Sequence, residues 1–546
     1  MLRALLALLL AGSTCSAGAA TLVHNVKGYT LNQGELETFA ALEFEGKTIT
    51  AVYDSALAAE QSQARDKIDA GGATLLPGLI DAHGHIGGYG QALASVDLFG
   101  AGSEAEAARR VADFAAQNKD AWIVGRGWNQ VLWQDKEFPE RSSLDSVDTD
   151  RPIALSRVDG HALWVNSTAL EMAGIDAETP DPDGGQIIRG ADGKPTGVLI
   201  DNAMDKVFRA IPSLTDDNIA EYQRQALLSA ASFGLTSIHD AGITAAQVKA
   251  FQTLQASGSL PLRVYAMLDV LDHENDAILA RGPQIDPEHM LDIRSVKISA
   301  DGALGSRGAA LFEDYSDKPG HTGLLLLSDE DLRHHMSRAM AAGYQVNTHA
   351  IGDLANARIL DLYEELMPQY KSTDQRHRIE HSQILRVEDI PRFASLGVIA
   401  SIQPTHATSD MNMAGDRLGK DRLVGAYAWK SLLDSGAHLA GGSDFPVEHP
   451  NPFFGLYSAI TRQNHDGEPP GGWLPEQKIS RTEALYLFTE GAAYSAHQEQ
   501  LIGRLAPGYF ADFILVKEDY FDMPESDIWN STVLETWVGG TKVYSK

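Results

Sequence analysis

The stretch Leu75-Leu76-Pro77-Gly78-Leu79-Ile80-Asp81-Ala82-His83-Gly84-His85 decides how this chain folds. The apolar run 79–82 predicts a buried strand, and Pro77-Gly78 marks its start. His83 and His85 stand two positions apart, so in an extended chain their side chains point to the same face. Imidazole nitrogen is a preferred zinc ligand, so the pair indicates a metal site at the end of a buried strand. Two histidines do not complete a coordination shell, and a pair exposed in a polar loop stays the alternative at this point.

The length and charge of the chain limit its architecture and partners. At 546 residues it is too long for one compact core, and we expect two or three units. A hydrophobic content of 44% and a charged content of 22% are ordinary for a soluble globular protein. The formal net charge of −30 argues against a nucleic-acid or anionic-membrane partner. The charge favours solubility and says nothing specific about a substrate, and the sequence leaves the oligomeric state undetermined.

Residues 1–20 predict a secretory signal peptide. A positive start at Arg3 precedes an apolar run, 4–11, that is too short to span a bilayer, and small residues follow. We expect cleavage after Ala19 or Ala20 and a secreted or periplasmic location. A lipoprotein anchored through Cys15 is the alternative, but the leucine usual three positions upstream is absent.

Cys15 is the only cysteine, so a chain that has lost the signal peptide has neither disulfides nor thiolate ligands. Any metal must then be held by His, Asp, Glu or Lys. No later stretch is long and apolar enough to predict a transmembrane helix.

The sequence pattern predicts an α/β protein whose two ends are rich in β-strands. Residues 21–74 and 502–546 each contain too few strands for a good core, so we expect one small β-sandwich built from both. Across 75–501, apolar runs alternate with helical patterns, which predicts a TIM-type (β/α)8 barrel. The eight expected strands are 79–82, 236–239, 262–268, 293–299, 344–348, 377–380, 398–402 and 438–441. The long gap after the first strand predicts an inserted region at about 97–215, with a helix at 104–117 and no assigned fold.

Barrel strands deliver functional residues at their carboxyl ends, and further candidate ligands stand there. They are Lys297, His349, His381 and Asp444. Each alone has a structural explanation, such as a satisfied core histidine. Together with His83 and His85 they come from five strands, which indicates a metal centre. For His239, at the end of the second strand, a core or supporting position is favoured over a ligand role.

Several motifs carry a resemblance to a known family. They are residues 77–85, 127–130, 159–166, 297–307, 443–444 and 508–513. On these motifs the sequence resembles the amidohydrolase superfamily of metal-dependent hydrolases. It looks most like the family 3 branch, which includes N-substituted formamide deformylase-like proteins. The resemblance covers essentially the whole mature chain, and it is specific for fold and metal site but a poor guide to substrate.

The resemblance implies a two-metal site. His83 and His85 would bind one ion with Asp444, and His349 and His381 the other. An ammonium has no lone pair to offer, and in related enzymes the lysine matching Lys297 is carboxylated and bridges both ions. The alternative for this lysine is a salt bridge to Asp301.

The expected chemistry is hydrolysis by a metal-activated hydroxide. Zn2+ suits nitrogen and carboxylate ligands in a protein without thiols, and two such ions lower the pKa of a shared water. Asp444 would act as general base and return the proton to a leaving amine. We expect cleavage of an amide, N-acyl or formamide bond. Lactone or ester hydrolysis, isomerisation or dehydration on the same centre, or metal-bound binding without turnover, are the alternatives.

Other residues are candidate substrate contacts. His161 in the inserted region is either a substrate or oxyanion contact or a structural histidine. Arg307 either binds a polar substrate group or pairs with Asp301. Trp128, with Trp133 and Trp164, either lines an apolar pocket or packs in a core, which is commoner for buried tryptophan.

Overall fold

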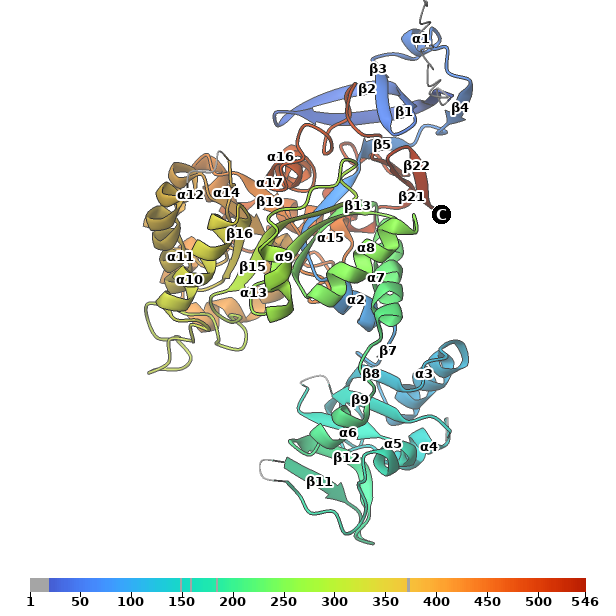
Figure 1. Ribbon diagram of the computed structural model, residues 1–546, viewed down its shortest axis with the longest axis vertical. Helices are drawn as coiled ribbons and strands as arrows, with labels where there is room; N and C mark the ends of the chain where they lie inside the picture. Colours follow the sequence, from blue (N-terminus) through green and yellow to red (C-terminus); the bar gives the residue numbers. More distant parts are fainter. Residues whose placement is uncertain (1–18, 148–149, 158–159, 183–184, 371–373) are drawn as a thin grey trace, which may run out of the picture.

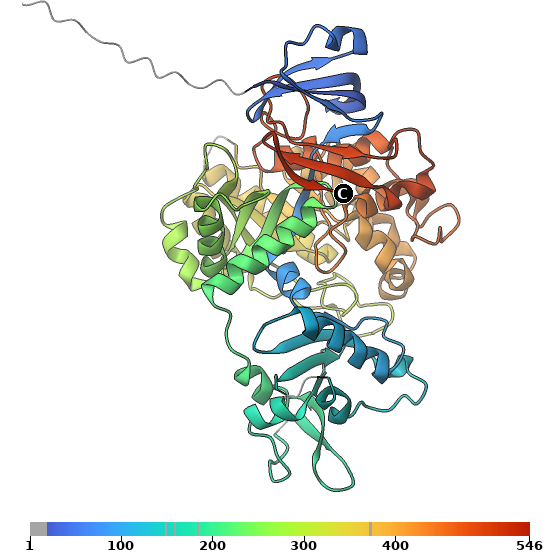
Figure 2. The same ribbon diagram turned by 90° about the vertical axis from the view of Figure 1, so that its right-hand side faces the viewer.

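The structure, a computed structural model, describes residues 19–546 except 148–149, 158–159, 183–184 and 371–373. Cys15 and nearly all of the predicted signal peptide therefore lie outside the described residues. Three β-sheets with their covering helices make up the described chain (Figures 1 and 2). Among the helices of this part, none has both the length and the apolar character needed to cross a membrane.

The central unit is an eight-stranded parallel sheet that curls into a nearly closed barrel, as predicted. Its strands are β6 (Leu79–Gly84), β13 (Leu235–Ile243), β14 (Arg263–Asp269), β15 (Leu291–Ser299), β16 (Gln345–Ala350), β17 (Arg378–His381), β18 (Ile399–Ile402) and β19 (Leu439–Gly441). They are paired in chain order from β6 to β19. The two outer strands meet through the segment after β19, where the Asp444 N–H donates to the His83 carbonyl over 2.7 Å. The barrel thus brings the first and last strand ends together.

Helices cover the outside of the barrel, so its strands are buried on both faces and read as near-continuous apolar runs. Every residue of β6 is buried. The helices of this unit are α2 (Ile86–Leu93), α7 (Asp216–Ala231), α8 (Ala245–Ala256), α9 (Asp276–Leu279), α10 (Asp329–Ala341), α11 (Asp353–Leu366), α12 (Ile390–Leu396), α13 (Pro404–Leu418), α14 (Trp429–Asp434), α15 (Pro452–Thr461), α16 (Arg481–Leu487) and α17 (Glu490–Ser495). Thr215 and Thr244 begin α7 and α8 with capping boxes, which satisfy the first backbone N–H groups.

Both ends of the described chain contribute to one further eight-stranded sheet. Its strands are β1 (Thr21–Asn32), β2 (Glu35–Glu45), β3 (Thr48–Tyr53), β4 (Asp66–Asp69), β5 (Thr74–Pro77), β20 (Phe513–Val516), β21 (Val533–Val538) and β22 (Thr541–Ser545), with α1 (Ala56–Ala59) beside them. The antiparallel pair β5–β20 joins the two ends. A buried ion pair between Arg263 and Asp512, 2.6 Å apart, ties this sheet to the barrel. The two-layer sandwich itself stays a prediction.

The inserted region forms a six-stranded sheet with its own core. It contains β7 (Val96–Asp97), β8 (Ile123–Trp128), β9 (Ile153–Arg157), β10 (Ala162–Val165), β11 (Gly185–Arg189), β12 (Pro195–Asp201), α3 (Glu104–Gln117), α4 (Arg141–Asp145), α5 (Ser167–Met172) and α6 (Asp205–Ala210). The region follows α2, which starts directly after His85, and so leaves the barrel from the carboxyl ends of its strands. Figure 1 shows it below the barrel, opposite the sheet that the chain ends build.

Candidate metal centre

His83 is held in one orientation by a buried carboxylate. Its Nδ1 lies 2.5 Å from Glu380 Oε2, and both side chains are 0% exposed. Because a carboxylate accepts, Nδ1 carries the proton and Nε2 keeps its lone pair, the arrangement found behind metal-ligating histidines. Glu380 was not predicted from the sequence, although it stands directly before His381 at the end of β17.

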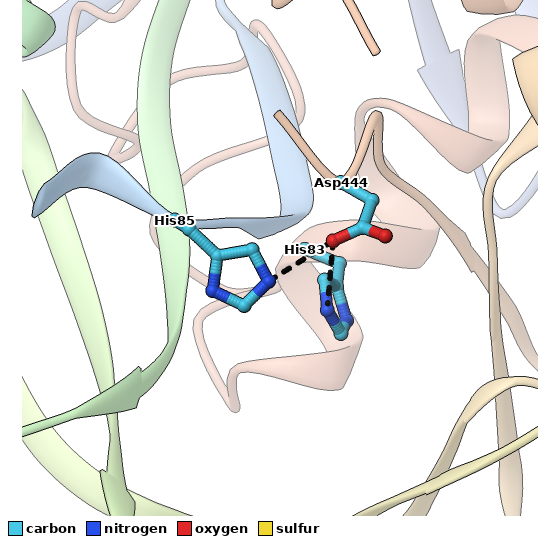
Figure 3. Close-up of side chains that lie close together, drawn as sticks. All are labelled: His83, His85 and Asp444. Carbon is cyan, nitrogen blue, oxygen red and sulfur yellow. Dashed lines mark ion pairs between the residues drawn. The ribbon is translucent and has the colours of Figure 1, made fainter. Parts of the chain in front are cut away.

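His85 is oriented in the same way by the backbone. Its Nδ1 donates to the Ala241 carbonyl over 2.8 Å, which leaves the lone pair on Nε2. That Nε2 lies 3.0 Å from Asp444 Oδ1, and His83 Nε2 lies 3.5 Å from the same oxygen (Figure 3). Two nitrogen lone pairs and a carboxylate oxygen repel one another unless a cation lies between them. The donor set therefore fits a metal ion.

Asp444 is placed by the backbone that follows β19. The residue has φ 61, in the left-handed region that non-glycine residues rarely adopt, and functional sites often keep such strain. Burial alone would raise the pKa of Asp444, but its close approach to His85 and the nearby imidazoles of His83 and His406 outweigh it and lower that pKa. The carboxylate therefore stays ionised.

Lys297 enters the site from β15. Its Nζ lies 3.3 Å from His83 Nε2, and the residue is 8% exposed. Burial lowers the pKa of Lys297, against the opposing charges of Glu380 and Asp444. Among the described residues Lys297 makes no salt bridge with Asp301, the alternative that the sequence left open.

The Asp301 carboxylate instead supports the backbone next to His349. It accepts hydrogen bonds from the backbone N–H groups of Ala310 at 2.8 Å, Ile351 at 3.0 Å and Gly352 at 2.8 Å. Its Oδ1 also lies 3.4 Å from His349 Nε2.

His349 and His381 bring a second pair of imidazoles to the site. Their ring centroids lie 4.4 Å apart, and the His381 ring lies 4.9 Å from that of His83. Burial, reinforced by His349 and His83, lowers the pKa of His381 well below its ordinary value, so the ring is neutral. Its Nδ1 and the Nε2 of His349 are buried without a hydrogen-bond partner in the described chain. Such atoms are costly unless a ligand meets them, so both fit a metal.

His406, which was not predicted from the sequence, also lies beside Asp444. It lies in the first turn of α13, with Nε2 3.8 Å from Asp444 Oδ2 and its ring nearly parallel to that of His381 at 5.9 Å. Two sets of three ligand atoms, each within 4.8 Å of one another, result: His83, His85 and Asp444, and His381, His406 and Asp444. The signal was available, because His406 stands four positions after the last residue of the seventh strand.

Two candidate substrate contacts lie in the inserted region. The His161 side chain is 75% exposed, and its Nδ1 lies 2.7 Å from Asp201 Oδ1. Trp128 is 0% exposed, and its indole N–H donates to the Leu155 carbonyl over 2.7 Å. Trp128 packs with Trp133 and Trp164 in the core of the insertion. The apolar ring of Trp128 is covered by other side chains of the insertion, so a substrate cannot contact it in this structure.

Arg307 and His239 are both engaged by other residues. Arg307 makes two hydrogen bonds to Asp317, at 3.0 and 2.8 Å, so its ion-pair partner is Asp317 and not Asp301. His239 is fully buried in β13, with Nδ1 3.1 Å from Arg378 Nη1. This is the core or supporting position expected for His239.

Comparison with known proteins agrees with this geometry. The model of the amidohydrolase family matches residues 66–544. The putative amidohydrolase YtcJ of Bacillus subtilis (strain 168) is 34% identical over 88% of this chain and 91% of its own. The N-substituted formamide deformylase of Arthrobacter pascens is 26% identical over 88% and 90%. The crystal structure of an uncharacterized metal-dependent hydrolase from Pyrococcus furiosus matches with a TM-score of 0.76 and 28% identity, over 92% of this chain and 100% of that one. The chain carries imidazoles and a carboxylate at the strand ends of a barrel, and the family model matches almost its whole length. It therefore belongs to the amidohydrolase family of metal-dependent hydrolases.

Proposed function

We propose that this chain is an exported hydrolase that cleaves a non-peptide C–N bond of the amide, N-acyl or formamide type in a small molecule. The observation that carries the proposal is the Asp444 carboxylate, ionised and surrounded by His83, His85 and His406 at the mouth of the barrel. The similarity to a relative named as an N-substituted formamide deformylase supports the choice of bond.

We assign two Zn2+ ions to the site. His83, His85 and Asp444 would hold the first, and His349 and His381 the second. When bound, the ions supply a Lewis acid and lower the pKa of a bound water to about 7. Lys297 would bridge them as a carbamate, formed when its neutral amine adds to carbon dioxide and releases one proton. Burial lowers the pKa of Lys297, which favours the neutral amine that this addition requires.

The residues of the chain orient the reactants and move the proton. Glu380 and Ala241 fix the tautomers of His83 and His85, so both Nε2 atoms face Asp444. Asp444 Oδ1 would be held together with these two nitrogens by the first ion, which leaves Oδ2 to accept a proton from the attacking water. Oδ2 then returns that proton to the amine nitrogen as the C–N bond breaks.

His161 remains our proposed contact between substrate and insertion, because its imidazole is exposed there. We assign no substrate role to Arg307 or Trp128, because Asp317 and the core of the insertion engage them.

A hydrolysis screen tests the proposed activity. Purified zinc-loaded protein is given N-substituted formamides, N-acyl amines, lactones and aryl esters, with Asp444→Asn as the matched inactive control. We expect amine release from one of the first two groups, at a rate that the control lacks. Turnover of lactones or aryl esters alone would show that the protein hydrolyses esters and not C–N bonds. Binding without turnover of any group would contradict an enzyme.

Export is tested separately, by the intact mass of the protein made in a bacterial host with a secretion pathway. We expect a mature chain that begins at Ala20 or Thr21. A chain that retains Met1, or that carries a lipid on Cys15, would contradict the proposed cleavage.

A further inference from the structure

The end of β18 and the first turn of α13 carry polar groups to which the proposed function gives no part in holding metal or moving the proton. Gln403, Thr405 and His406 are 2%, 6% and 9% exposed. Gln403 Nε2, Thr405 Oγ1 and His406 Nε2 are all buried, and none has a hydrogen-bond partner in the described part of the chain. Buried polar atoms of native proteins are nearly always paired, so three unpaired ones within four residues point to a ligand.

The direction of Gln403 follows from the alternation of strand residues. Ser401 lies opposite Glu380 in the register of β17 and β18, and Glu380 reaches His83 inside the barrel. Gln403 follows two positions later with an extended backbone, φ −118 and ψ 98, so its side chain takes the same face at the mouth. His406 reaches this mouth too, because its Nε2 lies 3.8 Å from Asp444 Oδ2.

The chemistry of these groups favours an oxygen over a third cation. The amide nitrogen of Gln403 only donates hydrogen bonds, so it has nothing to offer a metal. Gln403 and His406 stand at the N-terminus of α13, a helix of 15 residues. Gln403 is the N-cap residue, and its side chain makes no capping hydrogen bond. Backbone N–H groups and the helix dipole make such a terminus favourable for negative charge and unfavourable for a cation.

We propose that Gln403 and His406 form a subsite for the carbonyl oxygen of the scissile group, an inference that rests on the proposed function. As water attacks, a C–O bond forms and the carbonyl π electrons move onto this oxygen. Its growing charge is met by the amide N–H of Gln403 and by His406, which in this proposal carries its proton on Nε2, while Asp444 takes the proton of the water. The electrons return as the C–N bond breaks, and the amine nitrogen leaves with its electron pair and takes the proton from Asp444. Substrates must therefore present a free carbonyl oxygen beside the bond that breaks.

Three variants and a control test the subsite. Gln403→Leu and His406→Leu remove a donor, His406→Gln keeps one, and Asn412→Ala changes an exposed residue of the same helix. Zinc per chain is measured by elemental analysis. Affinity for methylphosphonate, a tetrahedral oxyanion probe, is measured by calorimetry on the zinc-loaded proteins. Circular dichroism compares the folds, and Gln403→Glu, which replaces the donor by a charged acceptor of the same size, serves if Gln403→Leu does not fold.

We expect zinc content to stay at the parent value in all variants. Methylphosphonate affinity should fall about tenfold or more in Gln403→Leu and His406→Leu, partly recover in His406→Gln and stay unchanged in Asn412→Ala. With a substrate in hand, kcat should fall by about 10²-fold for each lost donor, typical of an oxyanion contact, with KM little changed.

Two results would overturn the subsite. Loss of zinc in His406→Leu would make His406 a metal ligand, and unchanged methylphosphonate affinity in both leucine variants would leave these donors without an oxygen to bind. Failure of the proposed function is a separate result. The parent protein could cleave no C–N bond while its methylphosphonate affinity still depends on Gln403 and His406. That result would support the subsite and contradict the proposed amide substrate.

Discussion

Replacing Glu380 with glutamine should weaken zinc binding by about 10- to 100-fold while the protein still folds, because partners behind metal-bound histidines contribute this much affinity. Glu380 Oε2 lies 2.5 Å from His83 Nδ1, and neither side chain is exposed. Glutamine has the same size, but it accepts more weakly and carries no charge. It also offers an N–H group that favours the wrong tautomer, with the proton on the nitrogen that should bind metal.

The magnitude follows from the kind of bond that is lost. A hydrogen bond to a charged group contributes about 1.5–3 kcal/mol, and each 1.4 kcal/mol is a factor of ten in affinity. Because the pair is fully buried, water cannot replace the lost partner, so we expect the upper half of the range. Burial also raises the pKa of Glu380, so the parent should lose metal affinity in the same way as the pH falls and this carboxylate is protonated.

The assay is competition for zinc between the protein and a chromophoric chelator, at several pH values. Glu388→Gln is the matched control, because it makes the same chemical change at a side chain that is 67% exposed. Circular dichroism and thermal melting check the fold. A dissociation constant for Glu380→Gln within about twofold of the parent would refute the reasoning, since the carboxylate would then contribute nothing to the ligand behaviour of His83.

Three further outcomes follow from the geometry of the site. Lys297→Ala should lower zinc content and turnover together, with partial recovery when acetate is added to occupy the bridge; full zinc content and activity would exclude the carbamate. Asp444→Asn should keep much of the zinc but lose about 10²- to 10⁴-fold in turnover, the usual cost of losing a general base, and near-normal turnover would exclude its role in proton transfer. Burial raises the pKa of Asp240 from 3.8 to about 7, so its carboxyl contributes stability at low pH that is lost as the pH rises from about 4 to 7. Denaturant unfolding of metal-free protein at pH 5 and 7 should show Asp240→Asn gaining stability relative to the parent as the pH rises, by up to about 1.4 kcal/mol per pH unit, and a constant difference would contradict this.

Much of the barrel was predictable because its strands carry a local signal. Each strand is buried on both faces, so each appears in the sequence as a short apolar run between helical patterns. The candidate ligands were predictable for a related reason, since functional residues of this architecture stand where such runs end. His349 at the end of β16 and His381 at the end of β17 are examples.

The partners of these residues depend on contacts between distant segments. Glu380 is 297 residues from His83, and only the closing of the barrel places its carboxylate behind that imidazole. His406 lies on a helix rather than at the last position of a strand, so its approach to Asp444 depends on how α13 begins. Trp128 shows the opposite case. A tryptophan that packs in a core and one that lines a pocket have the same sequence pattern, and only the surrounding side chains decide between them.

The sequence by itself determined the repeating α/β pattern, the position of the strand ends and the residue types that stand there, because burial and strand alternation act over a few neighbouring residues. Only the tertiary structure decided that the two ends are joined by the pairing of β5 with β20, that the insertion builds its own core, and that Glu380 and His406 lie against the candidate ligands. The physical reason is that strand register and barrel closure are set by the packing of the whole chain. They place atoms hundreds of residues apart within hydrogen-bond distance, and no short stretch of sequence carries that information.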